Sequence, residues 1–489
     1  MIDRRYFLAG LMAGLASPGL AEVMERSPRP VARGKAAASS GSAAPGFETL
    51  IAAAKLGGTV GFVVADAATG AVLESHEPQA KLPPASVAKS ITALYALEKL
   101  GPAHRFVTRV LATGPVKGGV VQGDLVLAGG GDPTLQTGQL GDLGARPAKG
   151  GLEGATGRFP VWGGALPRLS MITDDQPVHV GYDPALSGLN LNFNRVYFEW
   201  KKAGGDWKIG MDARGERFVP AVSGITGRVV KRESPLFTYD QLPGREDWTV
   251  ASAALGKGGS RWLPVRQPAA YVAEVFRVLA RAQGVDLPKG EVAPALPAGA
   301  EIGRAESEPL TEVLRDMLKF STNITAECCG LTSSHQAVLA ASGRAMTDWA
   351  AGRLGMSSSF ADHSGLGAVS RITAADLVKA LVAAHRGGMG LKPILRDVGM
   401  RDAEGKEVKN HPVKVLAKSG TLNFVSGLAG HIVPPGGREM VFAIFTGDPA
   451  RRDAVPVAQR EGPEGVSGWT KRSRRLQGQL ISRWAGLYA

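Results

Sequence analysis

The sequence predicts an α+β fold of two or three domains, and three observations support this prediction. A chain of 489 residues is longer than a single hydrophobic core usually supports. Hydrophobic residues make up 44% and charged residues 21% of the chain, a composition typical of globular proteins. Helix and strand patterns occur near both ends, whereas residues 136–288 contain short candidate strands among many Gly, Pro and Trp residues. We therefore expect residues 136–288 to form an inserted, mostly β region.

The first residues have the pattern of an export signal. Arg4 and Arg5 form a twin-arginine pattern, followed by the apolar run 8–15 and by small residues suited to signal-peptidase cleavage. This run is too short to remain as a membrane anchor. We expect a twin-arginine-type signal peptide over residues 1–21, a flexible leader over 22–45, and a periplasmic mature protein without a stable membrane anchor. The alternative is that these residues begin an internal helix.

Charge and cysteine content narrow the possible partners. The formal net charge is +13, which favours anionic partners such as cell-wall polymer, acidic lipid or nucleic acid. The sequence has no nucleic-acid-binding module and no basic stripe with interleaved aromatics, so we expect no nucleic-acid binding. Cys328 and Cys329 are neighbours, and a disulfide between adjacent residues would be strained. We expect both to be small buried side chains.

The order of the predicted elements begins with a hairpin that leads into a helix. Residues 59–66 and 71–74 have strand character on either side of a turn, and two prolines then precede a helix from Ser86 to about Leu100. The remaining expected elements are strands at 196–200 and 227–230, helices at 269–283, 310–320 and 324–333, a helix opened by a capping box at Thr373-Ala374-Ala375-Asp376, a strand headed by Lys418, strands at 423–433 and 439–446, and a final helix at 469–487.

Three short motifs stand in a fixed order in the chain. They are Ser86-Val87-Ala88-Lys89, Ser321-Thr322-Asn323 and Lys418-Ser419-Gly420-Thr421. Taken alone, the first could be an N-cap beside a solvated lysine, the second a helix-breaking cap, and the third a polar turn. The order S-x-x-K, S-x-N, K-[ST]-G is typical of penicillin-recognising serine acyl-transfer enzymes. Together the motifs therefore indicate a single site.

The first two motifs supply the groups that acyl transfer needs. Residues three apart share a helix face, so the amine of Lys89 lies within reach of the Ser86 hydroxyl. A lysine can take the proton of a serine when its pKa is lowered, and a second ammonium, that of Lys418, helps to lower it. We expect Ser86 to be the nucleophile, Lys89 its base, and Ser321 a proton relay to the leaving amine. The backbone N–H groups of Ser86 and Thr421 would hold the oxyanion.

The third motif predicts how the substrate is held. Asn323 can donate to a substrate carbonyl and hold the lysine. A strand that begins at Lys418 can pair with an extended peptide through main-chain hydrogen bonds. Lys418, Ser419 and Thr421 suit a free carboxylate, which indicates an acyl substrate with a C-terminal acid. The expected substrate-binding set is therefore Asn323, Lys418, Ser419, Gly420 and Thr421.

Other kinds of site have weaker support in the sequence. Gly129-Gly130-Gly131-Asp132-Pro133-Thr134 lacks the G-K-[ST] that follows a phosphate-binding loop. The eight histidines, among them His363 and His431, show neither H-x-x-x-H nor H-E-x-x-H spacing, so we expect no metal site. No G-x-S-x-G elbow is present, which argues against an α/β-hydrolase. We expect the protein to need no cofactor.

The chain resembles the D-alanyl-D-alanine carboxypeptidase/endopeptidase family, the class C low-molecular-weight penicillin-binding proteins of the S13 peptidase type. The resemblance rests on the three motifs, on their wide separation, and on three further blocks, which are Gly123–Leu135, Ala326-Glu327 after the second motif, and Asp362-His363-Ser364-Gly365-Leu366 with Ser370-Arg371. The third motif is K-S-G-T here, where the family usually has K-T-G-T. Because Ser419 keeps the hydroxyl, we expect this departure to tune activity rather than remove it.

The resemblance implies both a fold and an activity. Residues 46–135 and 289–489 are expected to form a transpeptidase-like domain around an antiparallel five-stranded sheet, with one or two β-rich domains inserted over 136–288. The implied activity is that of a periplasmic serine D,D-peptidase, which hydrolyses D-Ala-D-Ala ends or D-Ala-diaminopimelate cross-links of peptidoglycan stem peptides. β-Lactams should acylate Ser86. The alternatives are a β-lactamase or esterase on the same scaffold, and a non-catalytic wall-binding protein.

Overall fold

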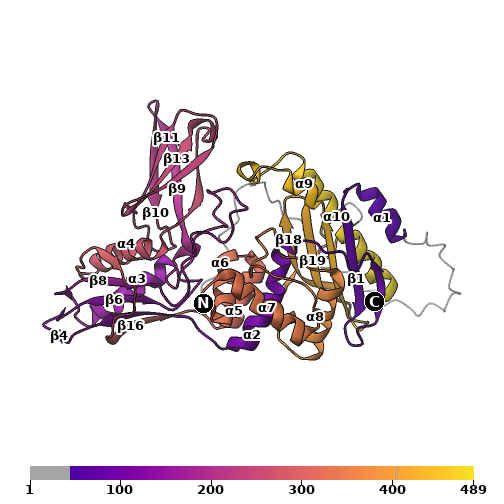
Figure 1. The fold of residues 1–489 in the computed structure, drawn as a ribbon, viewed down its shortest axis with the longest axis horizontal. Helices are drawn as coiled ribbons and strands as arrows, with labels where there is room; N and C mark the ends of the chain where they lie inside the picture. Colours follow the sequence, from indigo (N-terminus) through magenta and orange to yellow (C-terminus); the bar gives the residue numbers. More distant parts are fainter. Residues whose placement is uncertain (1–44, 403–404) are drawn as a thin grey trace, which may run out of the picture. The chain divides into compact units, whose positions relative to one another are not determined.

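The computed structural model describes residues 45–402 and 405–489 (Figure 1). The expected signal peptide, residues 1–21, and the expected leader up to residue 44 lie outside the described residues. Within the described part, no helix combines the length and the apolar character needed to cross a membrane.

One sheet joins the two ends of the described chain. Its order is β17-β18-β19-β20-β1-β2, and each neighbouring pair is antiparallel. The N-terminal hairpin thus pairs with the last strand, with Phe62 opposite Ile444. Five strands match the expected five-stranded sheet, and the sixth, β17, is a two-residue addition at the edge. The strands are β1 Thr59–Asp66, β2 Val72–His76, β17 Arg396–Asp397, β18 Lys414–Leu422, β19 Val425–Val433 and β20 Met440–Gly447.

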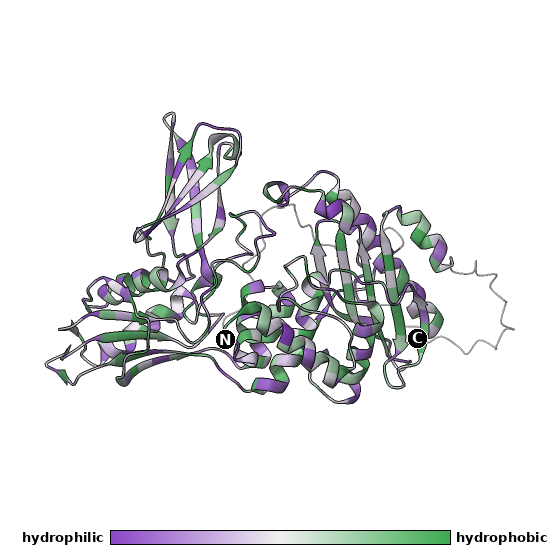
Figure 2. Ribbon diagram, in the orientation of Figure 1, coloured by the Kyte–Doolittle hydropathy of each residue, from purple (hydrophilic) through white to green (hydrophobic). Residues whose placement is uncertain are grey.

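Helices cover both faces of this sheet, which explains why its central strands β19 and β20 are buried along almost their whole length and are mostly hydrophobic (Figure 2). Alternate residues of a strand point to opposite faces. Val63 packs into a core with α2, α5, α7 and α8, whereas Phe62 packs into a second core with α1 and α10. The helices of this part are α1 Phe47–Ala54, η1 Ala85–Ala88, α2 Lys89–Leu100, α5 Leu310–Phe320, α6 Asn323–Ser334, α7 Leu339–Leu354, α8 Ala374–Arg386, η4 Lys392–Ile394, α9 Pro449–Asp453, η5 Val457–Gln459 and α10 Val466–Tyr488.

A separate core lies in the middle of the chain. It combines a five-stranded sheet of order β15-β8-β6-β3-β16, the helices α3 and α4, and strands from three smaller sheets. The smaller sheets have the orders β10-β9-β14, β11-β13-β12 and β4-β5-β7. The elements are β3 Val107–Ala112, β4 Val116–Lys117, β5 Val120–Val121, β6 Leu125–Gly129, α3 Thr137–Lys149, β7 Gly154–Ala155, β8 Phe159–Trp162, η2 Asn192–Asn194, β9 Arg195–Ala203, β10 Asp206–Asp212, β11 Ile225–Val230, β12 Phe237–Leu242, β13 Arg245–Ala251, η3 Ser252–Ala254, β14 Gly258–Pro264, α4 Pro268–Arg281, β15 Gly290–Val292 and β16 Ala300–Glu306.

The strand pairing differs from the expected domain bounds. Strands β3 and β6 precede residue 136 and strand β16 follows residue 288, yet all three belong to the five-stranded sheet of the middle core. The backbone N–H of Leu310 bonds to the carbonyl of His104 at 2.8 Å, which marks where the chain leaves and returns. We therefore propose that the insertion spans about residues 102–309. The change of composition at residue 136 reflects the density of Gly, Pro and Trp, which is independent of strand pairing.

Most local expectations agree with the structure, and three differ in detail. The helix expected from Ser86 begins as the 3-10 turn η1, and α2 itself starts at Lys89. Lys418 lies in the middle of β18 rather than at its head, because the strand already begins at Lys414. Thr373 caps α8 by accepting from the N–H of Asp376 at 3.0 Å. The Asp376 carboxylate does not complete the capping box, because it accepts hydrogen bonds from Ser357 and Ser358 instead. Both cysteines are buried and free, as expected.

Candidate active site

The first motif places Ser86 and Lys89 on consecutive short elements. Ser86 lies in the single turn of η1, and Lys89 begins α2. Lys89 has no exposed surface, and its Nζ atom lies 2.9 Å from Ser86 Oγ. The ammonium also donates to Asn323 Oδ1 at 2.7 Å and to the carbonyl of Ser364 at 2.8 Å. The amine is therefore aimed at the serine hydroxyl by two fixed oxygen acceptors.

The surroundings of Lys89 favour its neutral form. Burial lowers the pKa of Lys89 to about 7, although the carboxylates of Glu327 and Asp362 oppose this shift. Burial raises the pKa of both carboxyl groups in turn. Glu327 accepts the backbone N–H groups of His363 and Ser364 at 3.0 and 2.9 Å. A lysine with a pKa near neutrality can take a proton from a serine at physiological pH.

The third motif brings a second amine to the site. Lys418 Nζ donates to Ser321 Oγ at 2.9 Å and to the carbonyl of Ser419 at 2.7 Å. Burial lowers the pKa of Lys418 well below its usual range, and the charge of Lys89 adds to this shift. The sequence motifs predict that Lys418 lowers the pKa of Lys89. In the structure, burial is the main cause of the lowered pKa of Lys89. The charge of Lys89 instead contributes to the lowered pKa of Lys418.

The second motif occupies the break between two helices. Ser321 is the C-cap of α5 in a left-handed conformation, with a φ angle of 60°. Residues other than glycine rarely adopt this backbone conformation, and those that do concentrate at functional sites. Asn323 begins α6 and uses both ends of its amide. Its Oδ1 accepts from Lys89, and its Nδ2 donates to the carbonyl of Tyr182 at 2.8 Å.

Gly420 allows β18 to approach the turn that carries Ser86. A Cβ atom at position 420 would lie 2.8 Å from the backbone nitrogen of Ser86 and 2.9 Å from that of Val87. Both atoms belong to backbone, so neither could move aside alone. Thr421 follows on the same strand, and its Oγ1 accepts from Arg474 at 3.3 Å.

These residues surround a cavity of about 240 Å³. Six of the eight predicted site residues line it, namely Ser86, Ser321, Lys418, Ser419, Gly420 and Thr421. Lys89 and Asn323 join them through the hydrogen bonds described above. Lys319 and Arg396 also line the cavity and add two cationic side chains beside the amine of Lys418. Such a cavity suits an anionic group.

Sequence reasoning missed several residues of this site, among them Lys319 at the end of α5. Arg396 lies on β17, whose two residues carry no strand pattern. Glu327 and Asp362 were noted only as parts of family blocks, without a role. Tyr182 contributes a backbone carbonyl, which no side-chain pattern could indicate. The signal that could have identified Glu327 is its place as a single acid among the small and apolar residues of 324–331, directly after the second motif.

The expectation of no metal site rested on local histidine spacing. Among the described residues, His385, His431 and Glu439 offer ligand atoms that all lie within 4.8 Å of one another. These residues come from a helix, a strand and the turn after that strand, so no short spacing links the two histidines.

Comparison with known proteins gives concordant matches. The model of the D-Ala-D-Ala carboxypeptidase 3 (S13) family matches residues 46–463. A D-alanyl-D-alanine carboxypeptidase from Actinomadura sp. (strain R39) is 28% identical over 483 residues, which covers 84% of each chain. The crystal structure of penicillin binding protein 4 (dacB) from Haemophilus influenzae matches with a TM-score of 0.71 at 20% identity, over 89% of this chain and 99% of that chain. A structure of the same protein complexed with a novel β-lactam matches with a TM-score of 0.67, at the same identity and coverage.

Proposed function

The chain belongs to the D-Ala-D-Ala carboxypeptidase 3 (S13) family, and we propose that it cleaves peptidoglycan stem peptides through an acyl-enzyme on Ser86. It is a serine-type D,D-peptidase of the cell wall. The observation that carries the Ser86 assignment is the fully buried amine of Lys89, 2.9 Å from Ser86 Oγ. A lysine held in this way is a base for one particular hydroxyl.

In the proposed acylation step, Ser86 Oγ attacks the carbonyl carbon of the penultimate D-Ala while its proton passes to Lys89 Nζ. The backbone N–H groups of Ser86 and Thr421 stabilise the oxyanion. Ser321, whose hydroxyl accepts a hydrogen bond from Lys418, relays a proton to the leaving amine. The peptide bond breaks, the terminal D-Ala or the cross-linked residue departs, and water then hydrolyses the ester on Ser86.

The proposed substrate selection follows from the charges of the cavity. A stem peptide that ends in D-Ala presents a free carboxylate one residue beyond the cleaved bond. Lys319, Arg396 and Lys418 line the cavity next to Ser86 and can pair with that carboxylate. Asn323 positions the acyl part, and Ser419, Gly420 and Thr421 offer backbone and hydroxyl groups along β18.

A β-lactam combines an activated amide with a carboxylate, so it fits the same arrangement. We propose that β-lactams acylate Ser86 and remain attached to it. The solved H. influenzae relative forms a complex with such a compound. We further propose that the protein acts in the periplasm after export by the twin-arginine route, although the expected signal peptide lies outside the described residues.

Intact-protein mass spectrometry with benzylpenicillin tests the assignment. We expect the wild type to gain the mass of one antibiotic molecule at Ser86, and Ser86→Ala to gain none. Ser90→Ala, one residue after Lys89 on the same helix, is the matched control and should label like the wild type. Labelling that survives Ser86→Ala would contradict the proposal. Rapid antibiotic loss without an adduct would indicate a β-lactamase, and intact antibiotic without an adduct would indicate a non-catalytic wall-binding protein.

A further inference from the structure

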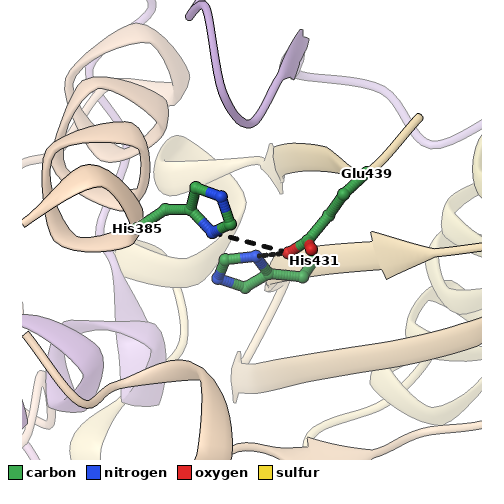
Figure 3. Close-up of side chains that lie close together, drawn as sticks. All are labelled: His385, His431 and Glu439. Carbon is green, nitrogen blue, oxygen red and sulfur yellow. Dashed lines mark hydrogen bonds and ion pairs between the residues drawn. The ribbon is translucent and has the colours of Figure 1, made fainter. Parts of the chain in front are cut away.

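A second cluster of polar side chains lies away from the catalytic motifs. His385 belongs to the last turn of α8, His431 to β19, and Glu439 to the turn before β20. Figure 3 shows both imidazole rings directed at one carboxylate. His431 Nδ1 lies 2.9 Å and His385 Nδ1 3.6 Å from the same oxygen, Glu439 Oε1. Each of these three elements thus contributes one possible ligand atom, and the three atoms lie close together.

The spacing of these atoms suits a small metal ion. Zinc binds imidazole nitrogen and carboxylate oxygen at about 2.0–2.2 Å in a tetrahedral arrangement, which places ligand atoms about 3.3 Å from one another. The two separations to Glu439 Oε1, 2.9 and 3.6 Å, lie on either side of this value. The separation between the two nitrogens is within 4.8 Å. Small rotations of the side chains would close the remaining difference.

The chemistry of the three side chains suits a transition-metal ion. Imidazole nitrogen and carboxylate oxygen both ligate such ions. His431 Nδ1 lies within hydrogen-bond distance of Glu439 Oε1, so binding of a metal at Nδ1 requires the proton of that nitrogen to shift to Nε2.

An open cavity gives access to the cluster. It has a volume of about 250 Å³, and His385, His431 and Lys392 line it together with the loop that precedes η4. A site with three protein ligands keeps a fourth position for water or another small molecule. The cavity supplies room for this fourth ligand on the side of the two histidines.

Lys392 limits how Glu439 can act. Its Nζ atom lies 2.6 Å from Glu439 Oε2, so it holds the carboxylate in place and leaves Oε1 for a further partner. Its positive charge also repels a cation at this distance. Replacing Lys392 by a neutral residue should therefore strengthen cation binding, whereas an ordinary surface site would not respond.

From this geometry we infer that His385 Nδ1, His431 Nδ1 and Glu439 Oε1 bind one divalent transition-metal ion of the zinc type, with a fourth position open to the cavity. Two imidazoles and one carboxylate favour zinc, copper or nickel over magnesium or calcium, which prefer oxygen ligands alone. The ion would link α8 to the β19–β20 hairpin, so its binding should raise the unfolding temperature.

Titration of the purified chain with Zn²⁺ against a chromophoric chelator, after removal of bound metal, tests the inference. We expect one equivalent to bind tightly and His385→Gln to weaken that binding at least tenfold. Glu439→Gln should weaken it similarly, and Lys392→Gln should tighten it severalfold. The matched control is His335→Asn, because His335 is an exposed helix C-cap with a φ angle of 54°, which Asn tolerates.

Two further measurements keep the test decisive if a variant folds poorly. Circular dichroism of the metal-free proteins should show His385→Gln unfolding close to the wild type, because its side chain is partly exposed. Co²⁺ in place of Zn²⁺ should give the visible absorption of a four-coordinate site in the wild type and lose it in His385→Gln. Equal affinity in wild type and a folded His385→Gln, or no stoichiometric binding, would overturn the inference.

Discussion

Burial of a single lysine determines the conditions under which the site can work. A buried ammonium loses hydration that three hydrogen bonds replace only in part, so its neutral form gains relative stability. Lys89 is in this state, while Glu327 and Asp362 lie close enough to oppose the shift. The pKa of the base is therefore a balance between desolvation and two buried acids. This balance can be tested by changing one of the acids.

We expect the rate of acylation by benzylpenicillin to rise with pH through a midpoint near 7, because Ser86 reacts when Lys89 is neutral. Glu327 makes the larger of the two carboxyl contributions that raise the pKa of Lys89, so Glu327→Gln should move the midpoint to lower pH. A shift of one unit corresponds to about 1.4 kcal/mol. Stopped-flow acylation rates at a series of pH values measure both midpoints.

The control for the shifted pH midpoint is a carboxylate far from Lys89. Glu291→Gln changes an exposed carboxylate of the insertion and should leave the midpoint unchanged. Glu327 would act only structurally if its variant changed the rate equally at all pH values. A midpoint that moved to higher pH would contradict the sign of the predicted electrostatic effect.

At the residue scale, the sequence predicts the groups that carry chemistry better than the groups that position them. The spacing within each motif is local, and the structure brings all eight predicted residues together. Arg396 and the carbonyl of Tyr182 reach the site through tertiary contacts, which local spacing does not encode. For the same reason histidine spacing did not indicate the cluster of His385 and His431.

At the scale of elements, the approach of β18 to η1 is the critical contact. Gly420→Ala would place a Cβ atom 2.8 Å from the nitrogen of Ser86, so strand and turn must separate. We expect acylation to slow at least about tenfold and stability to fall by about 1–3 kcal/mol. Gel-based labelling with a fluorescent penicillin and thermal unfolding measure the two effects.

Gly352→Ala is the matched control for the same substitution. Gly352 lies inside α7, and a Cβ atom there would have no neighbour within 4 Å. Alanine should stabilise this helix by about 0.5–1 kcal/mol and leave labelling unchanged. Equal labelling by Gly420→Ala and Gly352→Ala would show that the close approach of β18 is not needed.

Element prediction failed where composition conceals periodicity. Helix α3, Thr137–Lys149, contains three glycines and a proline, so its composition is that of a loop and no helix was predicted there. Its apolar face, with Leu140 and Leu143 in the middle core, overrides these weak propensities. In contrast, α10 and β20 were predicted because their patterns agree with their environment.

At the scale of the whole molecule, composition predicted the bounds of the insertion, whereas strand pairing defines them. The composition of β3, the strand that follows α2, does not distinguish it from a strand of the catalytic sheet. Only its pairing with β16, almost 200 residues later, shows that it belongs to the insertion. A pairing at such a distance leaves no mark in local sequence. The catalytic sheet was easier to predict, because the family resemblance implies a five-stranded sheet built from both ends of the chain.

One carboxylate of the insertion pairs with two buried arginines of the catalytic part. Asp175, in the loop that also carries Tyr182, forms ion pairs with Arg452 and Arg460. The arginine side chains are 2% and 8% exposed, so removal of their partner leaves two charges poorly solvated. We expect Asp175→Asn to lower the free energy of unfolding by about 3 kcal/mol or more, measured by urea denaturation with tryptophan fluorescence.

The same Asp→Asn substitution at an exposed ion pair shows how much of the stability loss is due to burial of the pair. Asp142 pairs with Arg217, and both side chains are 54% exposed. Asp142→Asn should therefore change the free energy of unfolding by less than about 1 kcal/mol. Because the carbonyl of Tyr182 accepts a hydrogen bond from Asn323, Asp175→Asn should also slow acylation, and Asp142→Asn should not. Similar losses of stability in the two variants would mean that the buried ion pairs do not hold the insertion against the active site.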